Sequence, residues 1–249
     1  QTFLPALPYT YPMDPTPRCI PAFAPGVFPD PLPALSAARR GLLWFECLAL
    51  FFVLPPALYF WRQALAFRVV PLVLAAAGFC AWWLVRQPGC GWAGLWRATG
   101  QARHLRGVAL WFLAGALPLA IITYIWLPER FLSFPRQRPG LWTLVCVLYP
   151  LLAAWPQEII FRAFFCRRYA ALFPQPVALI AASAISFGLA HALYGNWVAP
   201  LMSAVGGALF AWRYLRSGSL LVAGVEHGLW GDFLFTSGLG WFFYSGAIS

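Results

Sequence analysis

The chain alternates long apolar runs with short basic segments. Seven of the runs are close to the ~20 residues that an α-helix needs to cross a bilayer. They predict transmembrane helices at residues 41–61, 69–85, 108–127, 141 to the Glu158 region, 177–198, 200–214 and 220–235. A Gly- and Trp-rich interfacial loop is expected at residues 86–107. The pattern predicts an all-α, polytopic transmembrane helical bundle of about seven to eight spans.

Helix breakers and small residues refine this pattern. Ten prolines between residues 5 and 33 exclude a long helix there, so this segment is expected to be extended over the protein or the membrane surface. Pro55-Pro56 should break the first span, and Gly206-Gly207 should let a neighbouring helix approach closely. Three regions follow: a proline-rich N-terminal extension at residues 1–40, transmembrane helices with an interfacial basic loop at residues 41–140, and a helical core at residues 141–249.

Composition places the chain in the membrane class. Hydrophobic residues make up 61% of it and charged residues 10%, with a mean hydropathy of +0.70, whereas soluble domains average about 25% charged residues. The net charge of +10 comes from arginine alone. No basic segment has the character of a nucleic-acid-binding module, so the arginines are interpreted as topology signals. Their distribution, eleven against five, favours a cytoplasmic N-terminus. The six cysteines show no paired spacing and are interpreted as small core residues.

A few polar side chains stand inside the apolar runs of the C-terminal half. Glu158 and Arg162 are one helical turn apart and can pair. A carboxylate in hydrocarbon costs roughly 2.5–3.5 kcal/mol on insertion scales, so such a residue is usually functional. His191 and His227 occupy two later runs, at depths that let all three groups share one layer. Pro156 removes an N–H just before Glu158 and opens the helix there.

The alternative for each of these groups is a purely structural role. A membrane histidine often bridges helices through a hydrogen bond, and a Glu-Arg pair can simply neutralise itself. Glu226 and Asp232 flank His227 and are further candidates for a supporting role.

The residues Gln157-Glu158-x-x-x-Arg162, Phe187-x-x-x-His191 and Glu226-His227 resemble three motifs of the CPBP superfamily, the CAAX proteases and bacteriocin-processing proteins. Those motifs are E-E-x-x-x-R, F-x-x-x-H and H-x-x-x-N, and the resemblance covers about residues 141–240. It implies a glutamic-type intramembrane endopeptidase without a cofactor, located in a bacterial cytoplasmic membrane. In that family the first Glu is thought to activate water together with the histidine of the second motif.

Two positions depart from the family pattern. Gln157 stands where the first Glu is expected, and an amide is not a base near neutral pH. Three explanations remain: Glu158 has become the base, Gln157 is an inactivating substitution, or the chain is a non-catalytic relative; we favour the first. Gly231 stands where the third motif has Asn, so a second oxyanion donor is missing. Asn196 or a glycine backbone N–H would have to replace it, and Asp232 is expected to bridge helices.

The leading hypothesis is therefore a membrane-embedded endopeptidase. Glu158 and His191 would activate water, His227 would stabilise the oxyanion, and Arg162 would hold the carboxylate. The expected partners are the lipid bilayer and a peptide segment near the membrane: a C-terminal sorting or anchoring tail, a leader, or a prenylated CAAX end. A zinc protease that uses Glu158, His191 and His227 as ligands is one alternative. A non-catalytic membrane scaffold of the same fold is the other.

Overall fold

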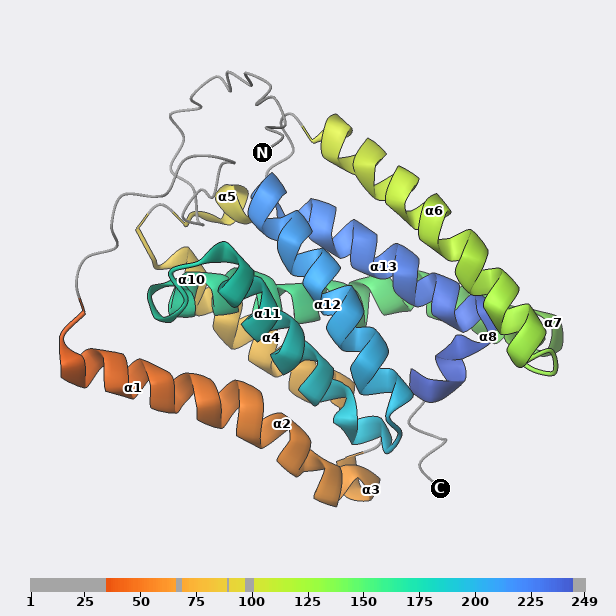
Figure 1. Cartoon of the computed structure of the whole chain (residues 1–249), viewed down its shortest axis with the longest axis horizontal. Coiled ribbons are helices and arrows are strands. Elements are labelled where there is room, and N and C mark those ends of the chain that lie inside the picture. The colour runs from red at the N-terminus through yellow and green to blue at the C-terminus, as the bar shows by residue number, and fades with distance from the viewer. Residues whose placement is uncertain (1–34, 66–68, 89, 97–100, 244–249) are drawn as a thin grey trace, which may run out of the picture.

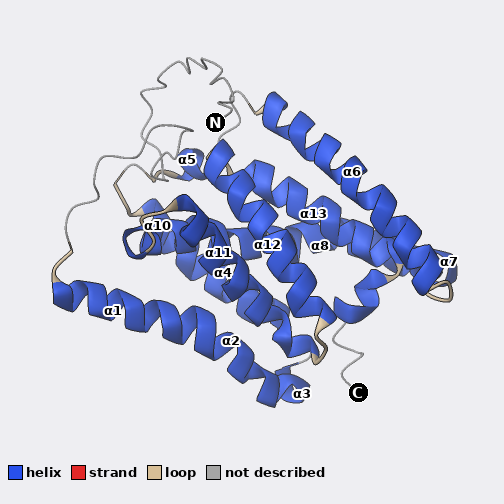
Figure 2. Ribbon diagram, in the orientation of Figure 1, coloured by secondary structure: helices blue, strands red, loops and turns tan. Residues whose placement is uncertain are grey.

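The computed structural model describes residues 35–65, 69–88, 90–96 and 101–243, and all regular elements within these ranges are helices (Figures 1 and 2). This confirms the all-α class. The α-helices are α1 (Ala37–Cys47), α2 (Leu54–Ala57), α3 (Arg62–Leu65), α4 (Val69–Val85), α5 (Trp92–Trp96), α6 (Ala102–Trp126), α7 (Ser133–Gln137), α8 (Pro139–Tyr149), α9 (Trp155–Glu158), α10 (Phe165–Tyr169), α11 (Pro176–Ala190), α12 (Val198–Ser217) and α13 (Leu220–Ser237). Short π- and 3-10 segments join several of them into longer rods.

All seven predicted spans fall on helical segments of the described chain. Five of these are long and apolar enough to cross a membrane: Ala37–Leu65, Ala102–Trp126, Pro139–Leu172, Pro176–Tyr194 and Val198–Ser217. The helix α4 is apolar but shorter, with 17 residues. The helix α13 carries Glu226, His227 and Asp232 and is not among the five. The chain is thus a polytopic helical bundle, and its described residues contain five candidate spans by length and composition, where seven to eight were predicted for the whole chain.

The boundaries differ from the predictions at three places. Pro55-Pro56 does not break the first span, because the helix continues from residue 37 to 65. A π-turn (Leu48–Val53) precedes the prolines, and its wider geometry accommodates the two N–H groups that they lack. The helix α6 begins at Ala102, so the end of the expected loop at residues 86–107 is helical. The helix α11 ends at Ala190 and continues as a 3-10 turn (His191–Tyr194), short of the predicted residue 198.

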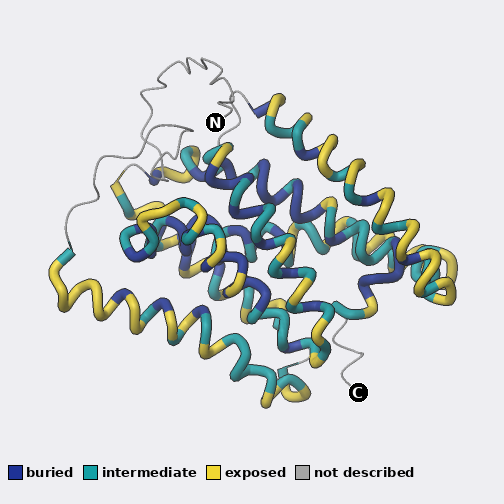
Figure 3. Tube along the Cα trace, viewed as in Figure 1, coloured by how far each residue is buried: buried dark blue, intermediate teal, exposed yellow. Residues whose placement is uncertain are grey.

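The bundle has an outer and an inner set of helices. Figure 1 shows the rod α1–α3 on one side and α6 on the other, with α4 and α8–α13 between them. The outer helices expose large apolar side chains, such as Phe45 (73%) and Trp126 (80%), whereas α11 and α12 are more buried (Figure 3). Soluble proteins rarely expose so many large apolar side chains, and this surface is suited to contact with lipid tails.

The rod from residue 139 to 172 is irregular around the predicted site. π-segments at Pro150–Ala154 and Ile159–Phe164 flank the single α-turn that contains Glu158. Proline lacks the N–H that closes a regular α-helical turn. Pro150 and Pro156 therefore explain why the helix widens to a π-segment between them. The carbonyl of Phe161 in the second π-segment accepts a hydrogen bond from Ser183 Oγ at 2.7 Å. This cross-helix bond satisfies a backbone group that the irregular turn leaves free.

Glycines set how closely the inner helices pack. On α13, Gly224, Gly228 and Gly231 share one face, and a Cβ atom added to each would meet Trp155, Pro150 and Tyr149, respectively. Because this face has no side chains, α13 lies directly against the irregular rod. At the contact between α11 and α12, a Cβ on Gly207 would lie 3.1 Å from Ala184 Cα, which confirms the predicted close approach for Gly207. Gly206 instead faces Phe210 of its own helix.

Two further predictions concern the N-terminal extension and the cysteines. The proline-rich extension at residues 1–40 lies outside the described residues except for its last six positions. Among the cysteines, Cys47, Cys80, Cys146 and Cys166 are free, and all but Cys146 are buried, as expected of small core residues. Cys90 is disulfide-bonded, so the interpretation of all six cysteines as core hydrophobes is wrong for this residue.

Candidate active site

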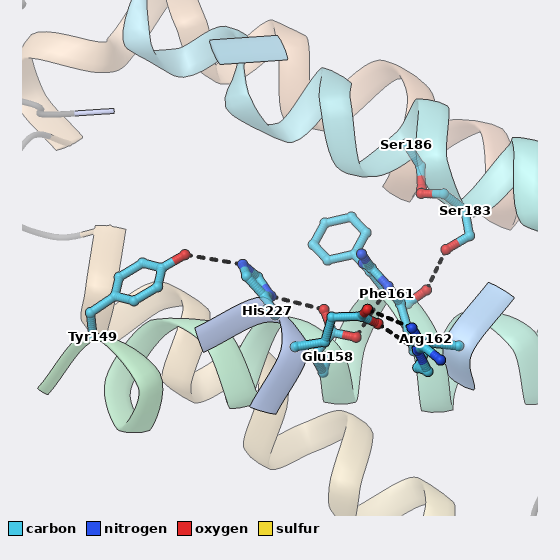
Figure 4. Close-up of polar contacts among 9 residues, drawn as sticks. Tyr149, Glu158, Phe161, Arg162, Ser183, Ser186 and His227 are labelled. Atoms are coloured by element: carbon cyan, nitrogen blue, oxygen red, sulfur yellow. Dashed lines mark hydrogen bonds and ion pairs between the residues drawn. The ribbon is translucent and has the colours of Figure 1, made fainter. Parts of the chain in front are cut away.

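Glu158 and Arg162 lie one turn apart in the irregular rod, and both side chains are fully buried. Arg162 Nε is 3.2 Å from Glu158 Oε2 (Figure 4). The Arg162 guanidinium carbon lies 4.3 Å from the ring centre of Phe187 and 5.5 Å from that of Phe210. Aromatic faces attract cations, so the two rings stabilise the buried charge. None of the three guanidinium nitrogen atoms of Arg162 has a hydrogen-bond partner among the described residues, so the contact with Glu158 is an ion pair without a hydrogen bond.

His227 reaches the same carboxylate from α13. Its Nδ1 atom is 2.9 Å from Glu158 Oε1, and the ring stacks on Phe210 with centroids 4.7 Å apart. A carboxylate only accepts hydrogen bonds, so Nδ1 of the neutral ring carries the hydrogen and Nε2 holds the lone pair. The pair therefore has the arrangement in which a carboxylate orients a histidine base in hydrolytic enzymes.

His191 is the first residue after α11 and is partly exposed. Its Nδ1 atom donates to the backbone oxygen of Phe187 at 2.8 Å, which leaves Nε2 as an acceptor. The His191 ring contacts the Phe187 ring with centroids 4.6 Å apart, and the His227 ring contacts the same Phe187 ring at 5.4 Å. The two imidazoles thus meet around Phe187. Within the described chain no hydrogen bond joins His191 to Glu158, although the sequence favoured a direct partnership between them.

Gln157 precedes Glu158 on the same turn. Its Oε1 atom is buried and has no hydrogen-bond partner among the described residues. Adjacent helical residues diverge by about 100°, so Gln157 and Glu158 point in different directions. The amide oxygen is an acceptor that can orient a water molecule, but it cannot take a proton from it.

Glu226 belongs to a second ion pair and not to the hydrogen-bonded pair of Glu158 and His227, here called the dyad. Arg213 of α12 donates to both of its carboxylate oxygens, through Nε and Nη2, each at 2.9 Å. The Glu226 side chain is fully buried, and that of Arg213 is nearly so. Consecutive positions on α13 thus send Glu226 toward α12 and His227 toward Glu158. Glu226 therefore supports the packing of α12 against α13.

Asn196 and Asp232 lie away from the hydrogen bonds of the dyad. The Asn196 side chain caps the start of α12, where Oδ1 accepts from Ala199 N at 2.9 Å, and its Nδ2 donates to Phe242 O at 2.9 Å. These bonds give its amide a structural role at the chain end. The Oδ1 atom of Asp232 is buried without a hydrogen-bond partner in the described chain. A helix-bridging role for Asp232 stays a prediction.

Sequence reasoning missed Tyr149, the last residue of α8. Its hydroxyl oxygen is 3.0 Å from His227 Nε2, the nitrogen that faces away from Glu158 (Figure 4). A tyrosine within an apolar run is ordinary in a membrane helix and gives no signal of its own. The one available signal is Gly231, because a missing side chain leaves room for a large group from another helix.

The zinc alternative requires three ligands around one ion. Over the described residues, no three His, Cys, Asp or Glu side chains are grouped closely enough to hold a metal ion. Glu158, His191 and His227 accordingly do not form a ligand set in this arrangement. Glu158 Oε1 and His227 Nδ1 are instead hydrogen-bonded to each other.

One of three comparisons with known proteins found a match, and the match covers the region of this site. Residues 139–232 match a protein-family model described as type II CAAX prenyl endopeptidase Rce1-like. This stretch includes Tyr149, Glu158, Arg162, His191 and His227. Neither a search of curated proteins nor a search of solved structures gave a match. The chain is thus an integral membrane protein whose residues 139–232 are similar to the Rce1-like type II CAAX prenyl endopeptidases, consistent with the CPBP superfamily and its intramembrane protease fold.

Proposed function

We propose that the chain is an intramembrane endopeptidase that hydrolyses a peptide bond in a membrane-proximal protein segment. The observation that carries this proposal is the buried hydrogen bond between Glu158 and His227, which lies in the region that matches the endopeptidase family. Arg162 holds the other oxygen of the same carboxylate. A buried carboxylate–imidazole pair is costly in a membrane protein unless it performs chemistry or bridges helices, and the family match favours chemistry.

In this proposal His227 Nε2 is the proton acceptor. Water attacks the carbonyl carbon of the scissile bond while one of its protons moves to His227 Nε2, and the carbonyl oxygen becomes an oxyanion. When the C–N bond breaks, His227 returns the proton to the leaving nitrogen. The products are a carboxylic acid and an amine, so atoms and charges balance, and no acyl-enzyme forms.

Glu158 acts through His227 rather than on water directly. Its Oε1 atom is hydrogen-bonded to His227, and its Oε2 atom forms an ion pair with Arg162 at 3.2 Å without a hydrogen bond. The carboxylate fixes the ring with its lone pair on Nε2 and stabilises the imidazolium that forms. This assignment moves the base from Glu158, where the sequence placed it, to the imidazole that Glu158 orients.

His191 is assigned the second contact to the attacking water. Its Nε2 atom is an acceptor, because Nδ1 is bound to a backbone carbonyl, and its ring contacts the same Phe187 ring as His227. A water that donates to the two Nε2 atoms keeps its lone pairs free for attack. Held in this way, the nucleophile has a defined orientation toward the carbonyl carbon of the bound substrate.

The substrate class follows from the setting of the site. The described chain has five helices that are long and apolar enough to cross a membrane, and the site is built on helices of this bundle, so the peptide is expected to reach it from the membrane or its surface. A C-terminal sorting or anchoring tail of an exported protein is the preferred substrate, followed by a leader peptide. A prenylated CAAX end is a further substrate to test, since the matching family is described as prenyl endopeptidases.

The test is cleavage of these peptides by the protein reconstituted in liposomes. Wild type, His227→Ala and His191→Ala are compared by mass spectrometry of the products. We expect wild type to cut one peptide class and both variants to lose most of the rate. Undiminished cleavage in both variants would overturn the proposal.

Gln157 favours a second candidate function, a non-catalytic scaffold or binding protein of the same fold. An amide occupies the position where the family pattern places an acid, and its oxygen has no partner in the described chain. The scaffold predicts specific co-purification of a membrane peptide that stays intact on prolonged incubation. Turnover of any tested peptide that depends on His227 decides against it.

A further inference from the structure

The Tyr149 ring fills the space that a side chain at Gly231 would occupy. The glycine lies four residues after His227 on α13, and a Cβ atom built on it would collide with the Cε1, Cζ and hydroxyl atoms of Tyr149. Any side chain at residue 231 is therefore incompatible with this position of the tyrosine. The phenol fills the volume that a side chain on the third motif would use.

The position of the Tyr149 ring is fixed by its neighbours. It packs edge to face on Phe235, with centroids 5.4 Å apart, and on the His227 ring at 6.0 Å. The backbone of Gly231 also lies directly against the ring, since a Cβ atom on it would overlap the Tyr149 atoms. The hydroxyl consequently has a defined direction, toward His227 Nε2 at 3.0 Å.

The direction of this hydrogen bond follows from the other end of the imidazole. His227 Nδ1 donates to Glu158, so Nε2 of the neutral ring accepts and the Tyr149 O–H donates. The hydroxyl thus occupies the one nitrogen that our proposed function uses as a base. Before water can give a proton to Nε2, the Tyr149 hydrogen has to turn to another acceptor.

We propose that this other acceptor is the carbonyl oxygen of the substrate, and that Tyr149 is the oxyanion donor of the site. The inference rests on the proposed function. In the free protein the hydroxyl caps His227. When the peptide binds, the O–H turns to the carbonyl oxygen, which frees Nε2 for the water proton and stabilises the negative charge that develops. The phenolic hydrogen stays on Tyr149 throughout, so only hydrogen bonds change.

The first experiment removes the hydroxyl and keeps the ring. In Tyr149→Phe, kcat should fall by about 10²–10³-fold, the usual loss for one oxyanion donor, with KM nearly unchanged. Tyr169→Phe is the matched control, because its hydroxyl also binds a side chain, Glu46 Oε1 at 2.9 Å, away from the dyad. Wild-type kcat in Tyr149→Phe would overturn the proposal.

The second experiment exchanges the two positions. Tyr149→Ala opens the space and removes the donor, and Tyr149→Ala with Gly231→Asn refills it with an amide donor four residues after His227. We expect the double variant to be at least about tenfold faster than Tyr149→Ala, because a side-chain amide is an effective oxyanion donor. Gly231→Asn alone should be poorly folded, since Tyr149 blocks the new side chain. A double variant no faster than Tyr149→Ala contradicts the shared position.

Failure of this inference is distinguishable from failure of the proposed function. If His227→Ala and Glu158→Ala lose cleavage while Tyr149→Phe keeps it, only the role of Tyr149 is wrong. If all these variants cleave like wild type, the proposed function is wrong as well. The thermal midpoint of each variant in detergent shows that a lost rate does not reflect unfolding.

Discussion

Two buried carboxylate–arginine pairs lie in the C-terminal half, and they differ in how completely they are satisfied. Glu226 and Arg213 form two parallel hydrogen bonds of 2.9 Å, one to each carboxylate oxygen. Glu158 and Arg162 make one contact of 3.2 Å, and the second oxygen of Glu158 goes to His227. Both Nη atoms of Arg162 lack a hydrogen-bond partner in the described chain.

Under the proposed function, this difference separates a structural pair, Glu226 and Arg213, from a pair that takes part in chemistry, Glu158 and Arg162. In a bidentate pair, two parallel N–H groups bind both carboxylate oxygens, so neither oxygen is left to orient a catalytic group. An open pair holds the carboxylate in place while leaving one oxygen for an imidazole. Because unsatisfied buried polar groups are costly, their retention beside a histidine is better explained by chemistry than by stability.

The largest expected effect is the loss of activity in Glu158→Gln. The amide keeps the size of the side chain but no longer fixes the His227 tautomer or stabilises the imidazolium, so kcat should fall by about 10³–10⁴-fold. Glu226→Gln is the control and should keep the activity per folded molecule. Initial rates on a cleaved peptide, normalised to folded protein, measure both. Equal losses in the two variants would remove the distinction between the pairs.

A loss of stability is expected when only one member of the structural pair is removed. Arg213→Met leaves Glu226 buried without a partner and should cost about 3–5 kcal/mol. Arg213→Met with Glu226→Leu should recover most of this loss, because an apolar pair replaces the ion pair. Thermal midpoints in detergent compare the variants. A double variant as unstable as Arg213→Met would mean that the charges themselves are needed.

A smaller gain is expected from Gln157→Glu. The change adds a base next to Glu158 at the position where the family pattern has an acid. Because His227 already serves as the base in the proposed function, the rate should rise by only about tenfold, less than the 10²–10⁴-fold typical of a general base. The measurement is kcat on the same peptide. Gln157→Leu is the control, since it removes the unpaired acceptor without adding a base. No gain in Gln157→Glu would show that residue 157 does not face the attacking water.

The smallest effect is expected from metal removal. Glu158 and His227 bind each other, and the described chain assembles no group of three metal ligands, so a chelator should leave the rate within about twofold of wild type. Activity is measured before and after dialysis against the chelator, followed by metal analysis. Activity that is lost to the chelator and restored by zinc would favour the zinc alternative.

The sequence predicted the helices and most of the chemical groups. Hydropathy located all seven helical segments, since burial in lipid requires long apolar helices whatever their packing. The i to i+4 spacing of Glu158 and Arg162 predicted their pairing, because helical neighbours are set by local geometry alone. It did not predict the uninterrupted helix through Pro55-Pro56, where a π-turn compensates for the prolines.

Partnerships across helices were decided by the tertiary structure. Sequence order placed His191 with Glu158, but the packing of α13 against the irregular rod gives that carboxylate to His227. It also brings Tyr149 to the other nitrogen of the same ring, 78 positions away in sequence. The physical reason is that three glycines on one face of α13 let this helix lie directly against the irregular rod, and no local sequence pattern specifies which helix packs there. The sequence determined which polar groups enter the membrane, and the packing decided which of them meet.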